Sequence, residues 1–315
     1  MDVYPYKMVP LLKEKIWGGR NLERLYRKPL PAGVPIGEAW ELADLPEGSS
    51  TVANGPQAGR PLGALIAAAG EALMGPTPPG PDGRFPLLLK LLDAADNLSV
   101  QVHPDERAVG EIPGAALKTE CWYVLASQGG TIYKGVKPGV TARDLRAALA
   151  TDDVADLLVR CEVREGDFHY LPAGTVHALG AGVVVAEVQT PSDTTYRVSD
   201  WGRGREVHVE RAMQCIRFDA TGEPIPGAAG ECLLKTGYFH VFLRSLAGGA
   251  RPIRGDGRPA AWMMLHGGGE VRTDSPEPRV NLAAGDTVLL PAALGDGEFV
   301  PDGTARWLEI LLPPF

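Results

Sequence analysis

The chain has 315 residues and a formal net charge of −8, with 44% hydrophobic and 22% charged residues, as in an ordinary soluble globular protein. It holds no basic cluster or basic-aromatic stripe, so we expect no nucleic-acid partner; an anionic ligand would need a few local cations. No stretch approaches the roughly 18 apolar residues that span a bilayer, and no signal peptide is evident, so we expect no membrane partner.

Strand-like runs predominate along the chain. Each run is apolar or alternating and is bounded by turn residues, which is typical of buried and half-buried strands. The runs are residues 37–45, 85–103, 119–125, 183–190, 238–245, 260–266 and 286–291. The 39 glycines and 28 prolines are spread along the chain, which fits many short strands joined by tight turns. The sequence therefore predicts a mainly β protein.

Helical periodicity is local and lies in the N-terminal half. Residues 61–74 predict a helix with a proline at its start. Residues 141–159 predict one helix or two short ones, because two threonines in this segment could each cap a helix. The Pro- and Gly-rich residues 75–83 predict a loop, and residues 219–232 predict an exposed connection between domains.

Two segments of the first half return in the second half in the same order. They are ECWYVLASQGG (120–130) and GDFHYLPAG (166–174), followed by their counterparts AAWMMLHGGGE (260–270) and GDTVLLPAA (285–293). The first copy is longer between these landmarks, and the helical segment 141–159 accounts for the extra length. The repeat predicts two related β-barrels, the first with a helical insertion.

The repeat is lost at one polar position. Ala260 stands where the first copy has Glu120, so a metal site that uses this carboxylate can belong only to the first copy. We therefore predict a first domain, residues 1–218, that carries the site and the helical insertions. The second domain, residues 219–315, is predicted to be a degenerate copy without a metal.

A polar face runs along the predicted strand that ends at His103. Successive side chains of a strand point to opposite faces, so Ser99, Gln101 and His103 share one face. A polar face cannot belong to a core unless something satisfies it. The same alternation places Lys118 and Glu120 on one face of the next strand.

The segment GDFHYLPAGTVH, which ends at His177, has the spacing G-x5-P-x-G-x2-H. This spacing resembles the second motif of the cupin superfamily, whose barrels hold a metal with two or three histidines and a carboxylate. His103, Glu120 and His177, with Gln101 beside them, would form a set of two nitrogen and two oxygen ligands. Such a set suits Zn²⁺ and does not exclude Mn²⁺, Fe²⁺ or Co²⁺. The predicted fold is a tandem cupin of two jelly-roll-like barrels, with a few short helices in the N-terminal half.

A third polar segment, EVQTPSDTTYRVSDW, covers residues 187–201. Glu187 follows an apolar strand-like run, and Arg197 comes ten residues later, past a turn. An arginine in this position could hold an anion with two hydrogen bonds. It could equally form a surface ion pair, which the spacing alone favours slightly.

Several of these segments together resemble the type I mannose-6-phosphate isomerases. The segments are KIWGG, GEAWEL, LSVQVHPD, KTECWYVL, LPAGTVHAL and EVQTPSDTTYRVSDW, in the family's order over most of residues 7–205. The length resembles the short bacterial form, which lacks a large helical domain. The resemblance implies a zinc-dependent enzyme, with one Zn²⁺ per chain, that interconverts mannose 6-phosphate and fructose 6-phosphate.

The resemblance also implies roles for individual residues. The implied zinc ligands are Gln101, His103, Glu120 and His177. The implied catalytic residues are Arg197, Lys118 and Glu187. Ser99 and Lys90 fall on positions associated with the phosphate end of the pocket, although a lysine inside an apolar strand could also be an ordinary buried one. His169 departs from the aromatic residue usual in similar sequences, and we interpret it as structural.

Two other functions remain open at this point. A cupin metal oxygenase that acts on a small organic acid would need an open iron site and would leave Gln101 and Lys118 without a task. A non-catalytic sugar-binding or regulatory cupin would be expected to lack Arg197 or Lys118, and both are present. The four cysteines are widely spaced without a C-x-x-C pair, so we expect a cytoplasmic protein. The sequence specifies no oligomeric state.

Overall fold

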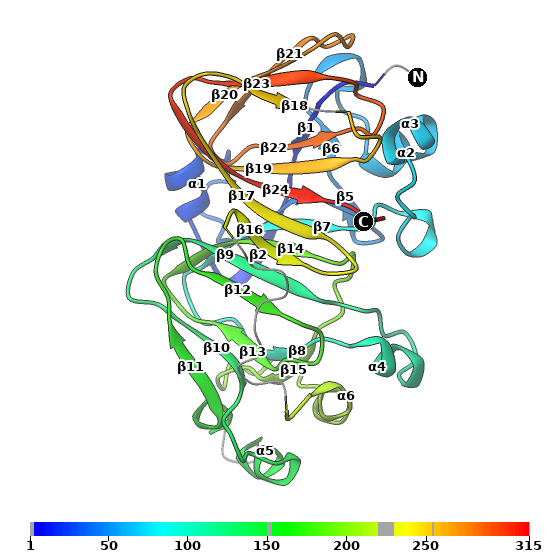
Figure 1. Ribbon diagram of the computed structural model, residues 1–315. Coiled ribbons are helices and arrows are strands. Elements are labelled where there is room, and N and C mark those ends of the chain that lie inside the picture. Colours follow the sequence, from blue (N-terminus) through cyan, green and yellow to red (C-terminus); the bar gives the residue numbers. More distant parts are fainter. Residues whose placement is uncertain (1–2, 150–152, 220–229, 254, 315) are drawn as a thin grey trace.

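The computed structural model describes residues 3–149, 153–219, 230–253 and 255–314. The four larger β-sheets lie in stacked layers, and short helices lie at the periphery (Figure 1). This arrangement confirms the predicted mainly β fold. Among the described residues, no helix is long and apolar enough to cross a membrane.

The first pair of sheets forms the lower half of the molecule in Figure 1. The six-stranded sheet has the order β12-β9-β14-β7-β3-β2, and the five-stranded sheet has the order β11-β10-β13-β8-β15. The strands of the six-stranded sheet are β2 (Leu11–Gly19), β3 (Ile36–Leu42), β7 (Leu88–Ala94), β9 (Glu120–Ser127), β12 (Phe168–Leu171) and β14 (Val183–Gln189). Those of the five-stranded sheet are β8 (Val100–Val102), β10 (Thr131–Val136), β11 (Leu158–Glu162), β13 (His177–Leu179) and β15 (Tyr196–Ser199). The two sheets face each other, because Leu92 and Trp122 of one pack in a single cluster with Ile132 and Leu179 of the other.

The second pair of sheets forms the upper half. The seven-stranded sheet has the order β16-β17-β24-β19-β22-β1-β6, and the four-stranded sheet has the order β18-β23-β20-β21. The strands of the seven-stranded sheet are β1 (Tyr6–Val9), β6 (Thr51–Val52), β16 (Cys232–Lys235), β17 (His240–Ala247), β19 (Ala260–His266), β22 (Thr287–Leu290) and β24 (Thr304–Leu311). Those of the four-stranded sheet are β18 (Arg251–Ile253), β20 (Gly268–Thr273), β21 (Arg279–Ala283) and β23 (Gly297–Pro301). Trp262 and Trp307 pack against Val271 and Phe299 across this pair.

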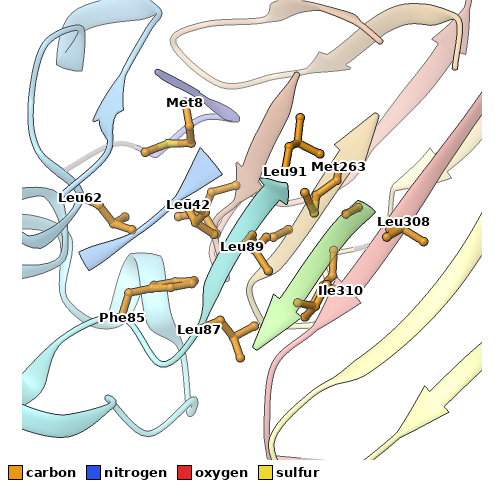
Figure 2. Close-up of a cluster of buried hydrophobic side chains, with 14 of the residues drawn as sticks. Met8, Leu42, Leu62, Phe85, Leu87, Leu89, Leu91, Met263, Leu308 and Ile310 are labelled. Carbon is orange, nitrogen blue, oxygen red and sulfur yellow. The ribbon is translucent and has the colours of Figure 1, made fainter. Parts of the chain in front are cut away.

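The two halves meet through a continuous apolar core. Leu89 and Leu91 of β7 lie in one cluster with Met263 of β19 and with Leu308 and Ile310 of β24 (Figure 2). The outer face of the six-stranded sheet is therefore covered by the seven-stranded sheet. Since both faces of β7 are covered, all seven of its residues are buried.

The beginning of the chain belongs to the sheet of the second half. Strand β1 pairs with β22, with Tyr6 opposite Leu289, and β6 continues the sheet beyond β1. Two further short strands, β4 (Asp44–Leu45) and β5 (Gly48–Ser49), form a separate hairpin. The division of the chain at residue 218 stays a prediction, and strands from both sides of it build the seven-stranded sheet.

The described helices all precede residue 216. The first five lie in the N-terminal half as predicted, while α6 lies beyond it and was not predicted. They are α1 (Asn21–Tyr26), α2 (Leu62–Ala69), α3 (Glu71–Met74), α4 (Glu106–Glu111), α5 (Ala142–Leu149) and α6 (Val209–Cys215), with 3₁₀ turns at Gly55–Gln57, Pro81–Gly83 and Val154–Leu157. The predicted helix 61–74 is two helices, because Gly70 between them has a left-handed φ of 50°.

Two predicted elements have different ends in the structure. The helical prediction 141–159 is wrong at its C-terminal end, because Leu158 begins β11 and pairs with Val136. The predicted strand 85–103 is divided into β7 and β8, which lie in different sheets. A turn separates them, where the backbone N–H groups of Ala95 and Asp96 donate to the Trp17 carbonyl. Most of the predicted connection 219–232 lies outside the described residues.

We predict that Leu89→Ala destabilises the protein by about 2–5 kcal/mol, because it removes buried methyl groups where two sheets meet. The free energy of unfolding can be measured by urea denaturation. The control is Leu25→Ala on α1, where the leucine is 42% exposed and the loss should stay below about 1 kcal/mol. Equal losses in the two variants would contradict a shared core between the halves.

Candidate active site

Three buried side chains converge inside the first pair of sheets. His103 follows β8, Glu120 begins β9 and His177 begins β13. Nε2 of His177 lies 3.0 Å from Oε1 of Glu120, and Nε2 of His103 lies 3.5 Å from Oε2. Among the described residues, this is the group of histidine, cysteine and carboxylate side chains whose ligand atoms lie close enough to hold a metal ion.

Backbone carbonyls fix the orientation of both imidazole rings. Nδ1 of His103 donates to the Thr194 carbonyl at 3.0 Å, and Nδ1 of His177 donates to the Thr175 carbonyl at 2.9 Å. Because a carbonyl can only accept a hydrogen bond, the ring proton lies on Nδ1 in both residues. In the neutral form of each ring, Nε2 carries the lone pair and points toward Glu120, as in a metal-ligating histidine.

The charge state of the cluster also suits a metal. Burial and the nearby Lys118 ammonium lower the pKa of His103 to about 3, so this ring is neutral near pH 7. Burial opposes ionisation of Glu120, but the Lys118 ammonium brings the pKa of its carboxyl well below the ordinary value. Nζ of Lys118 lies 3.2 Å from this carboxylate.

The cluster fits a divalent cation in geometry as well. Nε2 of His103 and both carboxylate oxygens of Glu120 are buried without a hydrogen bond. Metal bonds of about 2.0–2.2 Å at tetrahedral angles place ligand atoms roughly 3.4 Å apart. The observed separations of 3.0 and 3.5 Å lie on either side of this value. A bound cation would satisfy all three orphaned atoms.

Gln101 lies beside the cluster as predicted. Its Nε2 is 3.4 Å from Nε2 of His177, across the β8–β13 pair. A half-turn of the amide exchanges its nitrogen and oxygen and would present Oε1 to the same point. Gln101 is therefore placed to supply a fourth ligand.

A cavity of about 250 Å³ opens next to the cluster. Its described lining includes every other residue that the sequence analysis singled out for the site: Lys90, Ser99, Lys118, Glu187 and Arg197. The charged side chains of the lining are Lys15, Lys90, Lys118, Arg197, Arg205, Glu38, Glu187 and Asp193. Five cations against three carboxylates make this cavity locally positive in an acidic chain, which favours an anionic ligand.

A row of polar side chains crosses the floor of this cavity on one face of the six-stranded sheet. Glu187 of β14 stands between Trp122 of β9 and Lys90 of β7 in the strand register. Its Oε2 accepts a hydrogen bond from Nε1 of Trp122 at 2.8 Å, and its Oε1 lies 3.1 Å from Nζ of Lys90. Glu38 of β3 continues the row, 3.8 Å from Nζ of Lys90 and 3.0 Å from Nζ of Lys15.

The surroundings of this row favour the neutral form of Glu187 and the charged form of Lys90. Burial raises the pKa of Glu187, and the Lys90 ammonium only partly offsets this effect. Burial also works against the charge of Lys90, but Glu187 and Glu38 bring its pKa above the ordinary value. Lys90 is therefore firmly charged, while Glu187 is more easily protonated than Glu38, whose pKa lies below the ordinary value.

Arg197 enters the cavity from β15, where it stands opposite Gln101. Its guanidinium donates to the Glu206 carbonyl at 2.5 Å, and its Nε is buried without a partner. Burial lowers the pKa of Arg197. Among the described residues it forms no ion pair, so the surface ion pair that the spacing slightly favoured is not what the structure shows.

His169 stands opposite Trp122 in the β9–β12 pair, so it faces the interior of this half. It belongs neither to the metal cluster nor to the described lining of the cavity. Burial lowers its pKa, and its Nε2 is buried without a hydrogen bond. The interpretation of His169 as structural stays a prediction.

Four charged residues of the cavity were missed in the sequence: Lys15, Glu38, Asp193 and Arg205. A signal existed for two of them. Lys15 and Glu38 each stand two residues before a tryptophan in segments that carry the resemblance, and in a strand this spacing places each on the same face as its tryptophan. Asp193 and Arg205 lie in loops, where no periodicity indicates the direction of a side chain.

Two facing sheet pairs, with a His/Glu/His cluster inside one of them, define a tandem cupin with a candidate metal site. The family model described as "Phosphomannose isomerase type I, catalytic domain" matches residues 6–125. A mannose-6-phosphate isomerase of Streptococcus mutans is 34% identical over 92% of this chain and 93% of its own length. The mannose-6-phosphate isomerase ManA of Bacillus subtilis is 35% identical over 97% of this chain and 98% of its own.

Solved structures agree with these relatives. The crystal structure of the mannose 6-phosphate isomerase from Bacillus subtilis matches with a TM-score of 0.87 and 31% identity, over 98% of this chain and 99% of that one. A mannose 6-phosphate isomerase described as bound with zinc and yttrium shares the fold, with a TM-score of 0.75 at 19% identity. The chain belongs to the type I mannose-6-phosphate isomerase family and is an aldose–ketose isomerase.

We predict that Glu120→Gln and His177→Ala each lower the metal content of the purified protein by at least about tenfold, because each removes a ligand from a buried set. Metal per chain can be measured by inductively coupled plasma mass spectrometry. His169→Ala is the matched control, since this histidine faces the same interior and lies outside the cluster. Full metal content in both ligand variants would place the metal elsewhere.

The free energy of unfolding should depend on pH through the ionisation of Glu38. Burial opposes its charge, but Lys90 and Lys15 lower its pKa from 4.5 to about 2. A lowered pKa in the folded state stabilises the protein above the unfolded value, and this stabilisation is lost as the pH falls toward 2. We expect the difference in unfolding free energy between the wild type and Glu38→Gln to shrink by about 2 kcal/mol from pH 6 to pH 3.

Urea titrations at several pH values, on protein freed of metal by a chelator, measure this difference. Glu111→Gln is the control, because this glutamate is exposed on α4 and pairs only with the exposed Arg107 among the described residues. Its difference from the wild type should stay flat over the same range. A flat difference for Glu38→Gln as well would contradict the ion pairs assigned to Glu38.

Proposed function

We propose that the chain is a zinc-dependent enzyme that interconverts mannose 6-phosphate and fructose 6-phosphate through an enediol intermediate. The observation that carries this proposal is the buried His/Glu/His cluster beside a locally positive cavity. The family establishes the type of reaction, and the cluster and the cavity supply the two features that the reaction needs. These are groups for the reacting oxygens and cations for a phosphate.

One Zn²⁺ per chain is proposed, held by His103, Glu120, His177 and Gln101. Two imidazole nitrogens with a carboxylate and an amide oxygen form a set that zinc accepts. Ala260 begins β19 where Glu120 begins β9, and the described part of the second half offers no comparable cluster. Bound zinc would act as a Lewis acid toward the sugar oxygens.

The isomerisation moves a proton between C2 and C1 of the opened sugar. Glu187 is proposed to take part in this transfer, because burial raises its pKa toward the range in which a carboxyl can both accept and return a proton. The hydrogen bond from Trp122 and the ion pair with Lys90 hold the carboxyl group in one orientation. Lys118 is the second candidate, since it lines the cavity beside Glu120.

Negative charge develops on the sugar oxygens as the enediol forms. Arg197 and Lys118 are proposed to stabilise it, because both are cations that line the cavity, and the backbone around Arg197 limits its motion. Ser99 and Lys90 are proposed to hold the phosphate end. Binding there would position the reacting carbons by means of contacts remote from them.

We further propose a division of the chain, a location in the cell and a class of substrate. The residues before 219 form the catalytic unit and the later residues the degenerate one, although β1 and β6 lie in the sheet of the second half. The protein acts in the cytoplasm, which the widely spaced free cysteines favour. The substrate is a small sugar phosphate.

We predict that Lys118→Met and Glu187→Gln each reduce kcat for mannose 6-phosphate by about 10²–10⁴-fold, the usual contribution of a group that transfers protons or stabilises charge. A coupled assay that consumes fructose 6-phosphate measures the rate. Zinc content is measured in parallel, because a loss of metal would mimic a loss of catalysis. Lys137→Met is the control, since this lysine is exposed and donates to the Asp156 carbonyl outside the cavity.

Other results of the same assay would point to the alternatives. Iron with oxygen uptake and no isomerisation would favour the metal oxygenase. Binding of the sugar phosphate without turnover would favour the sugar-binding cupin. Full activity in zinc-free protein would contradict the proposed role of the metal.

A further inference from the structure

The second half contains a cavity of its own, of about 210 Å³. Its described lining comes mainly from β18, β19, β22 and β24 and from the loops beside them. By the order of the repeat, these strands correspond to β8, β9, β12 and β14 of the first half. The cavity therefore lies in the part of the second half that corresponds to the active site.

One polar pair of the active site is kept here. Nε1 of Trp262 donates to Oε1 of Glu309 at 3.2 Å, and the two residues stand opposite each other on β19 and β24. Trp122 and Glu187 make the same cross-strand contact on β9 and β14. Both Trp262 and Glu309 line the second cavity.

The second cavity is lined by arginines where the first half has its metal ligands. Ala260 lines the cavity in place of a carboxylate, and the described residues of this half contain no metal-ligating cluster. Arg251 of β18 and Arg258 of the following loop line it instead. The strand that supplies Gln101 in the first half thus supplies a guanidinium in the second.

The charge balance leaves one of these cations available. Glu309 pairs with Arg244, whose guanidinium lies 2.7 Å from it and also contacts Glu231, and Asp256 pairs with Arg258 at 2.8 Å. In the described part of the chain, the Arg251 guanidinium forms no ion pair or hydrogen bond. It lies 5.9 Å from the Trp307 ring. Among the described charged side chains of the lining, Arg251 is therefore the one that contacts no opposite charge, so its guanidinium is available to a ligand.

We propose that this second cavity binds a small organic anion through Arg251, as a site separate from the active site. The anionic group is a phosphate or a carboxylate, because either can accept two parallel hydrogen bonds from a guanidinium. Ile253, Leu290 and Leu294 give the cavity an apolar wall, which suits the carbon skeleton of such a ligand. A volume close to that of the active-site cavity limits the ligand to about the size of a sugar phosphate.

Trp122 and Trp262 occupy equivalent positions in the two halves, so their indole signals report on both sites in the wild-type protein. The zinc-loaded chain, labelled with ¹⁵N, is titrated with inorganic phosphate, mannose 6-phosphate or acetate. The indole N–H signals of the six tryptophans are followed by NMR and assigned by single Trp→Phe replacements. A saturable shift of the Trp262 signal, with an affinity different from that of the Trp122 signal, is expected. Phosphate and acetate distinguish the two possible anionic groups.

The residue test compares Arg251→Gln with Arg279→Gln. Arg279 lies on β21 of the same half, is exposed and pairs with Glu270 outside the cavity. We expect Arg251→Gln to weaken the Trp262 response at least tenfold and to leave the Trp122 response and the isomerase rate unchanged. Arg279→Gln should change neither response.

Two results would overturn the proposal. One is a Trp262 signal that none of the three probes shifts in the wild type. The other is a Trp262 response that Arg251→Gln leaves intact. Both are independent of the active-site assignment, which the Trp122 signal and the coupled assay test separately.

Discussion

The six-stranded sheet lies between two interiors and contributes side chains to both, and most of the structure depends on this constraint. One face is covered by the seven-stranded sheet of the second half, and the other face forms the floor of the active-site cavity. Because side chains of a strand alternate, β7 sends Leu89 and Leu91 into the apolar core and Lys90 into the cavity. A slip of one residue in the register would exchange these two environments.

Charged groups on the cavity face are stable only as a connected set. Lys90, Glu187 and Glu38 are each less than 9% exposed, and an isolated charge at such depth would be strongly unfavourable. Each of them contacts at least one opposite charge, and Glu187 accepts a further hydrogen bond from Trp122. Removing one member leaves its partner buried and uncompensated, so the same contacts that hold the sheet in place also orient the site.

The repeat shows how one framework supports different chemistry. Both halves keep a tryptophan that donates to a glutamate on the neighbouring strand, Trp122 to Glu187 and Trp262 to Glu309. Only the first half combines this pair with a carboxylate, Glu120, at the start of the strand that carries the tryptophan; the second half has Ala260 at that position. The framework is therefore set by cross-strand packing, while the chemistry depends on a few exchangeable side chains.

The sequence by itself determined the strand-rich class, the concentration of helices in the N-terminal half and the set of candidate ligands. These features are local: the alternation before His103 and the turn spacing before His177 express the directions of side chains within one strand or turn. Only the tertiary structure decided that 85–103 divides between two sheets, that β1 joins the sheet of the second half, and that Lys15, Glu38 and Arg205 reach the cavity. These outcomes depend on pairings between strands far apart in the chain, and local periodicity carries no information about which strands become neighbours.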